Sequence, residues 1–337
     1  MIPHAWSVLR CLPVHPADDA GLINTTLLVG DPARYVAQRV NPIFAPEVHH
    51  DIEAVTAHLA ARGLPTPRLV RTDQGDLWAR DVEGGVWRIL DFVPGRTVHR
   101  LSSAAPALAL ARAAGGLVAR FHRAVEDLEH TYRHVRPGVH DTPLHMERLE
   151  RAAAGAEGEG RALADAILEA WRTWQGRLDA PVRHCHGDLK VSNLRFNEAG
   201  EGVCLLDLDT FARLPLDVEL GDAWRSWCNP GGEDLCDARF DLEIFSAAVA
   251  GYNEARPLLA EEREPLAGAV ERIALELASR FCRDAFEDRY FGWDPARFPS
   301  RPAHNLQRAR SQLALARSVR QQRAAIERVL AARARRV

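Results

Sequence analysis

The chain has 337 residues, of which 47% are apolar and 26% are charged, and its formal net charge is −3. This composition is typical of a globular protein and excludes disordered and fibrous classes. The small net charge predicts no nucleic-acid partner for the chain as a whole. At roughly 150 residues per domain, the length allows two lobes.

The sequence predicts neither a membrane segment nor a secretory signal. No apolar run approaches the roughly 20 residues of a membrane helix, and the first residues lack the basic and then apolar order of a signal peptide. The six cysteines form no C-x-x-C pair, which argues against a disulfide framework and a zinc ribbon. We therefore expect a cytoplasmic protein with reduced thiols and no membrane partner, as a monomer or a homodimer.

The first 92 residues predict a small antiparallel sheet with one helix. Two apolar runs, residues 25–29 and 35–40, flank a Gly-Asp-Pro turn and predict a hairpin. Apolar residues at helical spacing predict a helix from Pro46 to about Gly63. Strand-like segments follow at residues 68–72, 77–81 and 86–92, with glycine-containing turns between them.

Beyond Pro94 and Gly95 the pattern is mainly helical. Helical periodicity covers residues 110–121, 161–174, 241–256 and 266–286, and residues 152–160 predict a flexible connection. Residues 181–196 lack this periodicity, and residues 203–209 predict a buried strand that delivers carboxylates to its edge. The sequence therefore predicts an α+β fold, with a small lobe at residues 1–93 and a larger lobe at residues 94–337.

One short loop carries residues suited to phosphoryl transfer from ATP. Asp188, Lys190 and Asn193 lie in the sequence HGDLKVSN, and Asp207 follows with Asp209 beside it. Phosphoryl transfer requires a group that orients or deprotonates the acceptor hydroxyl, oxygen ligands for Mg²⁺ and positive charge at the γ-phosphate. We assign these roles to Asp188, to Asn193 with the two later aspartates, and to Lys190. Lys190 is the one lysine among the chain's 43 basic residues.

The same residues resemble a known family. Residues 186–193 resemble the catalytic loop of the protein-kinase-like superfamily, and residues 205–211, LLDLDTF, resemble the metal-binding segment of its aminoglycoside and choline phosphotransferase branch. Within that branch the N-acetylhexosamine 1-kinase group is the most similar. The shared sequences are GLINTT at 21–26, QRVN at 38–41, LDLDT at 206–210, YF at 290–291 and HNL at 304–306.

This resemblance implies a two-lobed fold with ATP between the lobes. Residues 21–26 would then cover the phosphates, with Asn24 and backbone N–H groups in place of the repeated glycines of protein kinases. Arg39 stands where kinases have a phosphate-binding lysine. Glu53 or Glu47 on the following helix is its expected partner, and Glu53 is preferred because it lies nearer the helix centre. The backbone of Asp91, Phe92 and Val93 is the expected adenine-binding strip.

The resemblance also assigns roles in the larger lobe. Asp222 would cap the catalytic loop from behind, and His186 would likewise be structural. Arg225 and residues 289–304 would contact the acceptor, which the resemblance predicts to be an N-acetylhexosamine phosphorylated at its anomeric hydroxyl. Homoserine, choline, an aminoglycoside or another sugar suits the same machinery. The competing class is a non-catalytic nucleotide-binding protein, which the missing strand lysine and the sparse glycines favour.

Two other functions receive less support. His184, Cys185 and His186 suggest a metal clip, but no second ligand pair lies at zinc spacing. Residues 304–337 carry nine arginines and one acid, a pattern that nucleic-acid-binding helices share. Apolar residues for packing accompany these arginines and no aromatic residue interleaves them, which favours a solvated basic helix face.

Overall fold

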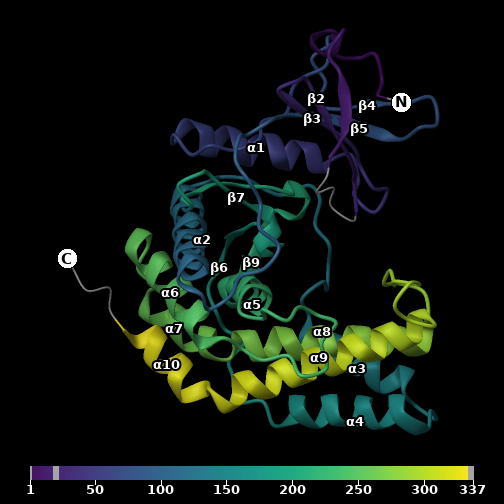
Figure 1. The fold of residues 1–337 in the computed structure, drawn as a ribbon, viewed down its shortest axis with the longest axis vertical. Coiled ribbons are helices and arrows are strands. Elements are labelled where there is room, and N and C mark those ends of the chain that lie inside the picture. Colours follow the sequence, from purple (N-terminus) through teal and green to yellow (C-terminus); the bar gives the residue numbers. More distant parts are fainter. Residues whose placement is uncertain (1, 18–22, 333–337) are drawn as a thin grey trace.

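The computed structural model describes residues 2–17 and 23–332. It has a five-stranded antiparallel sheet with one helix, followed by a mainly helical part, which confirms the predicted α+β class (Figure 1). We call the part up to β5 the small lobe and the remainder the large lobe. The division at residues 93 and 94 stays a prediction.

The small-lobe sheet has the order β1-β2-β3-β5-β4, with antiparallel neighbours throughout. The predicted hairpin is confirmed, and Gly30 in its turn has a positive φ of 101° that favours glycine. The strands are β1 (Val14–Pro16), β2 (Thr25–Val29), β3 (Tyr35–Arg39), β4 (Ala79–Arg80) and β5 (Val86–Asp91).

Helix α1 (Val48–Ala61) confirms the predicted helix and joins the two lobes. Its apolar stripe of Val48, Ile52, Val55 and Leu59 is buried in a core that continues into the large lobe. The ribbon places α1 between the sheet and the large lobe (Figure 1). A separate apolar cluster that includes Trp6 and Trp87 covers the other face of the sheet.

Two predicted strands differ from the structure. Residues 68–72 form no strand and pair with β5 through one isolated bridge between Leu69 and Leu90. The strand expected at residues 77–81 is limited to β4, because the backbone turns away at Asp76 and again at Asp81, where each N–H bonds locally. Strand β1 was not predicted.

The large lobe contains two small two-stranded antiparallel sheets. β6 (Val182–Cys185) pairs with β9 (Ala212–Pro215), and β7 (Leu194–Phe196) pairs with β8 (Gly202–Leu205). The surrounding helices are α2 (Ala105–Ala124), α3 (Thr142–Ala152), α4 (Gly158–Arg172), α5 (Leu216–Trp227), α6 (Leu242–Ala255), α7 (Ala260–Ala267), α8 (Ala269–Glu287), α9 (Arg301–Gln321) and α10 (Arg323–Ala331).

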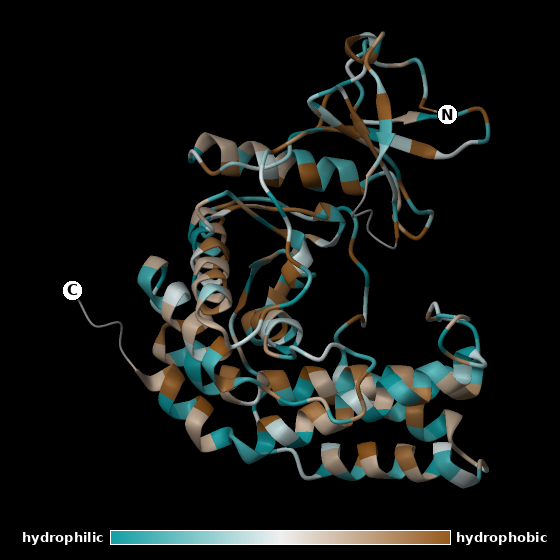
Figure 2. Cartoon of the chain, in the orientation of Figure 1, coloured by the Kyte–Doolittle hydropathy of each residue, from teal (hydrophilic) through white to brown (hydrophobic). Residues whose placement is uncertain are grey.

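These helices differ in how much of their surface is buried, and α5 and α8 are buried on most sides. Figure 2 shows hydrophobic and hydrophilic residues mixed along α4, α8 and α9. The single helix expected at residues 266–286 is divided at Gly268, where α7 ends and α8 begins. Within the described ranges, no helix has the length and apolar character needed to cross a membrane.

Candidate active site

The loop after β6 and the segment after β8 lie side by side. Hydrogen bonds join them at three points: the Thr210 hydroxyl donates to the His186 carbonyl at 2.8 Å, His186 Nε2 donates to the Leu206 carbonyl at 2.8 Å, and the Leu206 N–H donates to the Asn193 carbonyl at 2.8 Å. His186 is fully buried and takes part in two of these bonds. The two sequence motifs, although separated along the chain, therefore form one structural unit.

Four predicted residues meet in this unit, and we call them the Asp188 cluster: Asp188, Lys190, Asn193 and Asp207. Lys190 Nζ lies 2.9 Å from Asp188 Oδ2 and 3.7 Å from Asp207 Oδ2. Asn193 Nδ2 donates to the same Asp188 oxygen at 3.0 Å. An acid, a cation, an amide and a second acid thus share one small volume.

The charges of this cluster are not balanced. Burial raises the pKa of Asp207, and the negative charges of Asp188 and Asp209 raise it further. Burial would lower the pKa of Lys190, but Asp188 and Asp207 outweigh it and raise that pKa above its usual value. One lysine therefore interacts with two carboxylates and cannot neutralise both. A further cation would stabilise the ionised form of Asp207.

Glu219, not Asp222, caps the loop at residues 186–193 from behind. Both Glu219 carboxylate oxygens accept backbone N–H groups, from His186 and from Gly187 at 2.8 Å each. Burial would raise the pKa of Glu219, but hydrogen bonding and charge from His122 and His186 hold it below its usual value. The predicted capping role of Asp222 is wrong, because its carboxylate instead accepts Arg225 Nε at 3.0 Å and Nη2 at 2.9 Å.

We expect Glu219→Gln to lower the melting temperature by about 3 °C, equivalent to ~2 kcal/mol, because an amide NH₂ would face a backbone N–H donor. Differential scanning calorimetry measures this shift. Glu254→Gln is the matched control, since Glu254 forms an exposed ion pair with Arg112 and should change stability little. Equal melting temperatures for the two variants would contradict the capping role.

A buried polar network lies behind the loop. Side-chain atoms of His122, Cys185 and Glu219 lie within 4.8 Å of one another, and all three residues are buried. His122 Nε2 lies 3.2 Å from Glu219 Oε1, and its Nδ1 lies 2.8 Å from the Tyr252 hydroxyl. Burial raises the pKa of the Cys185 thiol well above its usual value, so the thiol stays protonated. The group is a hydrogen-bonded support for the loop.

Arg39 does not point toward the Asp188 cluster, and the expected pair with Glu53 does not form. Arg39 Nε lies 3.0 Å from Asp81 Oδ2, and Nη2 lies 2.8 Å from Glu83 Oε2, on a side chain that is 39% exposed. Glu53 Oε1 lies 3.0 Å from Arg71 Nη2 instead. Successive strand residues face opposite sides of a sheet, so Arg39 shares the face of Ala37, which points away from α1.

On the face of the sheet toward α1, Gln38 and Arg88 occupy the corresponding positions of β3 and β5. No role for either residue was predicted from the sequence. They are directly paired between β3 and β5. Gln38 Oε1 accepts Arg88 Nε at 2.9 Å and Nη2 at 2.7 Å, and Arg88 is only 1% exposed. The sequence did contain a signal for Arg88, because a charged residue within the apolar strand sequence VWRILD is unusual.

Asp209 is held by the small lobe and does not join the Asp188 cluster as a free metal ligand. Arg88 binds both oxygens of its carboxylate, with Nη2 at 2.9 Å from Oδ2 and Nη1 on Oδ1. Asn24 Nδ2 donates to Oδ2 at 2.8 Å, and the Asp209 side chain is fully buried. Asn24 also accepts the Asn41 N–H at 2.9 Å, so its side chain is committed within the protein. Gly21 and Leu22 of the expected phosphate loop lie outside the described residues.

The expected adenine strip is partly occupied by the protein's own hydrogen bonds. The Asp91 N–H donates to the Arg68 carbonyl at 2.9 Å, and the Phe92 N–H donates to the Arg34 carbonyl at 3.0 Å. The Val93 carbonyl accepts Arg195 Nε at 3.0 Å. Across residues 2–17 and 23–332, the Val93 N–H donates to no acceptor.

Arg225, the expected acceptor contact, is buried and paired on two sides. Besides Asp222, its Nη1 lies 3.0 Å from Glu233 Oε1, and the residue is 8% exposed. Asp222 and Asp188 both raise the pKa of Lys190, which places this group near the Asp188 cluster. The arginine thus presents no unpaired charge to a ligand.

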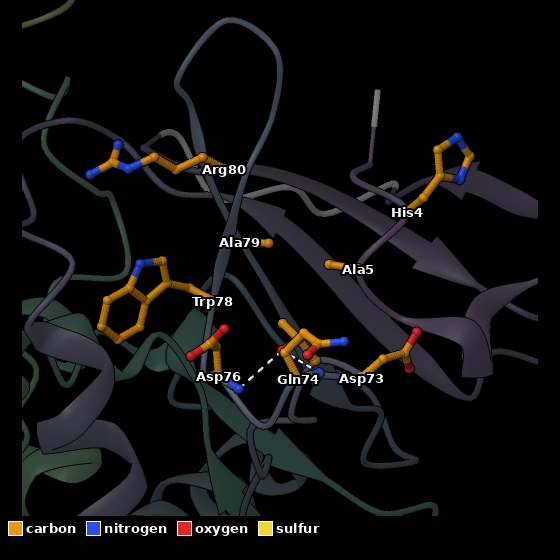
Figure 3. A pocket seen from close by; sticks show the side chains of 9 residues that line it. His4, Ala5, Asp73, Gln74, Asp76, Trp78, Ala79 and Arg80 are labelled. Atoms are coloured by element: carbon orange, nitrogen blue, oxygen red, sulfur yellow. Dashed lines mark hydrogen bonds between the residues drawn. The ribbon is translucent and has the colours of Figure 1, made fainter.

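A cavity of about 500 Å³ lies elsewhere, in the small lobe. Figure 3 shows its lining, which comes from the N-terminal segment, the 72–76 turn and β4 with the residue before it. None of the lining residues belongs to the Asp188 cluster. The lining consists of His4, Ala5, Thr72, Asp73, Gln74, Asp76, Trp78, Ala79 and Arg80.

Comparisons with known proteins agree with this geometry. The model of the phosphotransferase enzyme family (APH) matches residues 16–258. A curated homoserine kinase of Acidiphilium cryptum is 31% identical over 214 residues, which cover 62% of this chain and 61% of that protein. The chain thus spans about three fifths of the length of this relative.

Solved structures share the fold. An aminoglycoside phosphotransferase from Alicyclobacillus acidocaldarius has a TM-score of 0.66 at 17% identity, covering 96% of this chain and 97% of that chain. Amicoumacin kinase in complex with AMP-PNP, Ca²⁺ and Ami has a TM-score of 0.58 at 14% identity, covering 89% and 87%. With the family model matching most of its residues, this chain belongs to the phosphotransferase enzyme family and has the protein-kinase-like fold.

Proposed function

We propose that this protein transfers the γ-phosphoryl group of ATP to a hydroxyl group of a small molecule, with Mg²⁺ as the metal. The observation that carries the proposal is the Asp188 cluster, in which Lys190 Nζ bridges the carboxylates of Asp188 and Asp207. This is the set of groups that phosphoryl transfer needs, because the protein mainly positions the reactants and stabilises charge.

Asp188 is the group that receives the acceptor's proton. Its carboxylate orients the hydroxyl and takes the proton as the oxygen attacks the γ-phosphorus, while the bond from that phosphorus to the bridging oxygen of ADP breaks. Lys190 donates to the transferring oxygens, where negative charge collects. Its ion pair with Asp188 holds the ammonium near that position before the nucleotide arrives.

The residues present suit a hard divalent cation. Asp207 is a half-buried carboxylate whose pKa is raised by desolvation and by neighbouring negative charge, so a cation would stabilise its ionised form. Asn193 uses its Nδ2 on Asp188, and within the described ranges its Oδ1 accepts no hydrogen bond. We propose these two oxygens as the protein's metal ligands. When bound, Mg²⁺ would offset the charge of the phosphates.

We propose the Val93 N–H as a hydrogen-bond donor to adenine, since Asp91 and Phe92 have already used theirs. The AMP-PNP complex of amicoumacin kinase supports a nucleotide site in this fold. Gly95, whose φ of 134° favours glycine, follows at the start of the connection to the large lobe.

For the acceptor, we propose an N-acetylhexosamine phosphorylated at its anomeric hydroxyl. A neutral, hydroxyl-rich acceptor suits a site in which Arg225 is already paired with Asp222 and Glu233. A carboxylate-bearing acceptor that bound Arg225 would compete with Asp222 and Glu233 for its guanidinium. Residues 289–304, where we also expected contacts, lie beyond the part matched by the family model.

Homoserine is the second candidate acceptor. Its support is the similarity to the homoserine kinase of Acidiphilium cryptum, whose aligned part covers 61% of that protein. Homoserine carries both a carboxylate and an ammonium group, so it would need separate charged partners in the site.

A panel assay with Mg-ATP decides between these candidates. It compares N-acetylhexosamines, their 1-O-methyl glycosides, homoserine, choline and an aminoglycoside, with phosphorylated product measured by mass spectrometry. Turnover of the free sugar but not of its methyl glycoside would support the anomeric hydroxyl, and turnover of homoserine alone would reject the sugar. ATP binding without any product would favour a non-catalytic nucleotide-binding protein.

Lys190→Arg should lower kcat by roughly tenfold or more, equivalent to ~1.4 kcal/mol of transition-state stabilisation. The planar guanidinium is larger than the ammonium and does not reproduce its contacts with both carboxylates. Steady-state kinetics on the preferred acceptor measure the loss, with Arg112→Lys as a control on an exposed ion pair. Wild-type kcat in Lys190→Arg would contradict the assigned role.

A further inference from the structure

Neither acidic residue of helix α1 pairs with Arg88, the cation on the face of the sheet toward this helix. Asp51 accepts His130 Nε2 at 2.8 Å and the backbone N–H groups of Arg133 and His134 at 2.9 Å each. Glu53 is half-buried, and its carboxylate lies 3.0 Å from Arg71 Nη2 and 3.7 Å from Arg68 Nη2. In protein kinases, by contrast, a glutamate of this helix holds the strand lysine, so both partners belong to one lobe.

The α1 residue near Arg88 is His49, and it is neutral. His49 is fully buried, and its Nδ1 donates to the Pro46 carbonyl at 2.7 Å. Its Nε2 has no hydrogen-bond partner among the residues that the structure describes. Burial, with the charge of Arg88, lowers the pKa of His49 to about 4. A neutral imidazole provides no counter-charge for a guanidinium.

Arg88 is held from the opposite lobe. Its partner Asp209 lies in the short helical turn after Asp207, in the large lobe. Burial would raise the pKa of Asp209, but the charge of Arg88 and hydrogen bonds from Arg88 and Asn24 keep it below its usual value. The ionised carboxylate and the guanidinium therefore stabilise each other across the lobe interface.

We propose that Arg88 is the cation that helps to position the nucleotide, and that the ion pair with Asp209 orients Arg88. The Arg88 side chain is therefore in place only when the two lobes are closed on each other. The inference rests on the proposed function, because it takes the phosphates to lie beside Asp207. A guanidinium has five N–H groups. Hydrogen bonds to Gln38 and Asp209 use four of those of Arg88, and one on Nη1 has no partner within the described part of the chain.

This arrangement couples nucleotide binding to lobe closure. A lysine–glutamate pair within one lobe survives when the lobes separate, whereas separation here leaves both Arg88 and Asp209 without their partner. Nucleotide bound beside the turn that carries Asp207 favours the closed state, because it interacts with the two states differently. The same pair fixes the turn that carries Asp207, two residues before Asp209.

The test is the affinity for Mg-AMP-PNP, measured by isothermal titration calorimetry. We expect Arg88→Met and Asp209→Asn each to weaken binding about tenfold or more, and the double variant to bind no more than about twofold weaker than the weaker single variant. Arg88→Lys should recover part of the affinity. Arg39→Gln, on the neighbouring strand, removes the ion pairs with Asp81 and Glu83; it is the matched control and should bind like the wild type.

Two results would overturn the inference. Losses that multiply in the double variant would show that the two residues act independently. Weaker Mg²⁺ binding in Asp209→Asn, together with unchanged nucleotide affinity in Arg88→Met, would make Asp209 a metal ligand. If variants fold poorly, hydrogen exchange of the β3 and β5 amides in Arg88→Lys provides the second measurement, and wild-type protection by nucleotide would contradict the coupling.

These measurements need no phosphate acceptor. If the predicted binding losses occur but no compound is phosphorylated, the inference stands and the proposed function fails. If an acceptor is phosphorylated but the binding losses are absent, the proposed function stands and the inference fails.

Discussion

Asp188→Asn should lower kcat by about 10³-fold, within the range that general-base catalysis contributes. Asparagine keeps the size of the side chain and an oxygen that accepts Lys190 Nζ and Asn193 Nδ2, but it cannot take the acceptor's proton. Because the nucleotide is held by other groups, the dissociation constant for Mg-AMP-PNP should change by less than about threefold. Steady-state kinetics and calorimetry measure the two quantities separately.

The matched control is Asp165→Asn, which removes an exposed carboxylate paired with Arg161 on α4. It should leave kcat and nucleotide affinity unchanged. If Asp188→Asn retains wild-type turnover, Asp188 is not the base. If it instead loses nucleotide binding to the same extent as turnover, its carboxylate supports the site's structure.

Most of the Asp188 cluster could be predicted because three of its four residues are neighbours in the chain. Asp188, Lys190 and Asn193 lie within six residues, and the loop between β6 and β7 brings them together without help from distant segments. Asp207 was also predictable, since a buried strand that ends in carboxylates delivers them to a sheet edge. Local sequence therefore specified the parts of the site that local structure builds.

The small-lobe residues near the proposed nucleotide site could not be predicted, because the sequence does not determine which strand residues face this site. Gln38 and Arg39 are adjacent, and a one-residue change in strand phase exchanges the inward and outward side chains. The choice of Gln38 follows from the pairing of β3 with β5 and from the packing of α1, neither of which is encoded in the strand itself. Arg88 could be recognised as unusual, but its partner Asp209 lies 121 positions away.

The capping residue was missed for a related reason. Glu219 and Asp222 are three positions apart on α5, so they lie on neighbouring parts of the same helix face. Only the position of the helix relative to the loop decides which carboxylate meets the His186 and Gly187 N–H groups. The resemblance to kinases predicted that an acid would be there, and the structure identifies Glu219.

Asp207→Asn should abolish most turnover and yet stabilise the metal-free protein. Loss of the proposed metal ligand should reduce kcat by roughly 10³-fold or more. The pKa of Asp207 is raised in the folded state by burial and by Asp188 and Asp209, so its ionised form disfavours folding at neutral pH. Removing that charge should raise the melting temperature by roughly 2 °C at pH 7.

The pH dependence and a paired variant test this explanation. Because the raised pKa means that the folded state binds the proton more tightly, the gain from Asp207→Asn should fade as pH falls below the folded pKa and vanish below the usual carboxyl pKa. Asp209, two residues later, has a lowered pKa, so Asp209→Asn should lower the melting temperature at neutral pH. Added Mg²⁺ should stabilise the wild type but not Asp207→Asn. A common direction of change in both variants would contradict the opposite electrostatic roles that the structure gives these two aspartates.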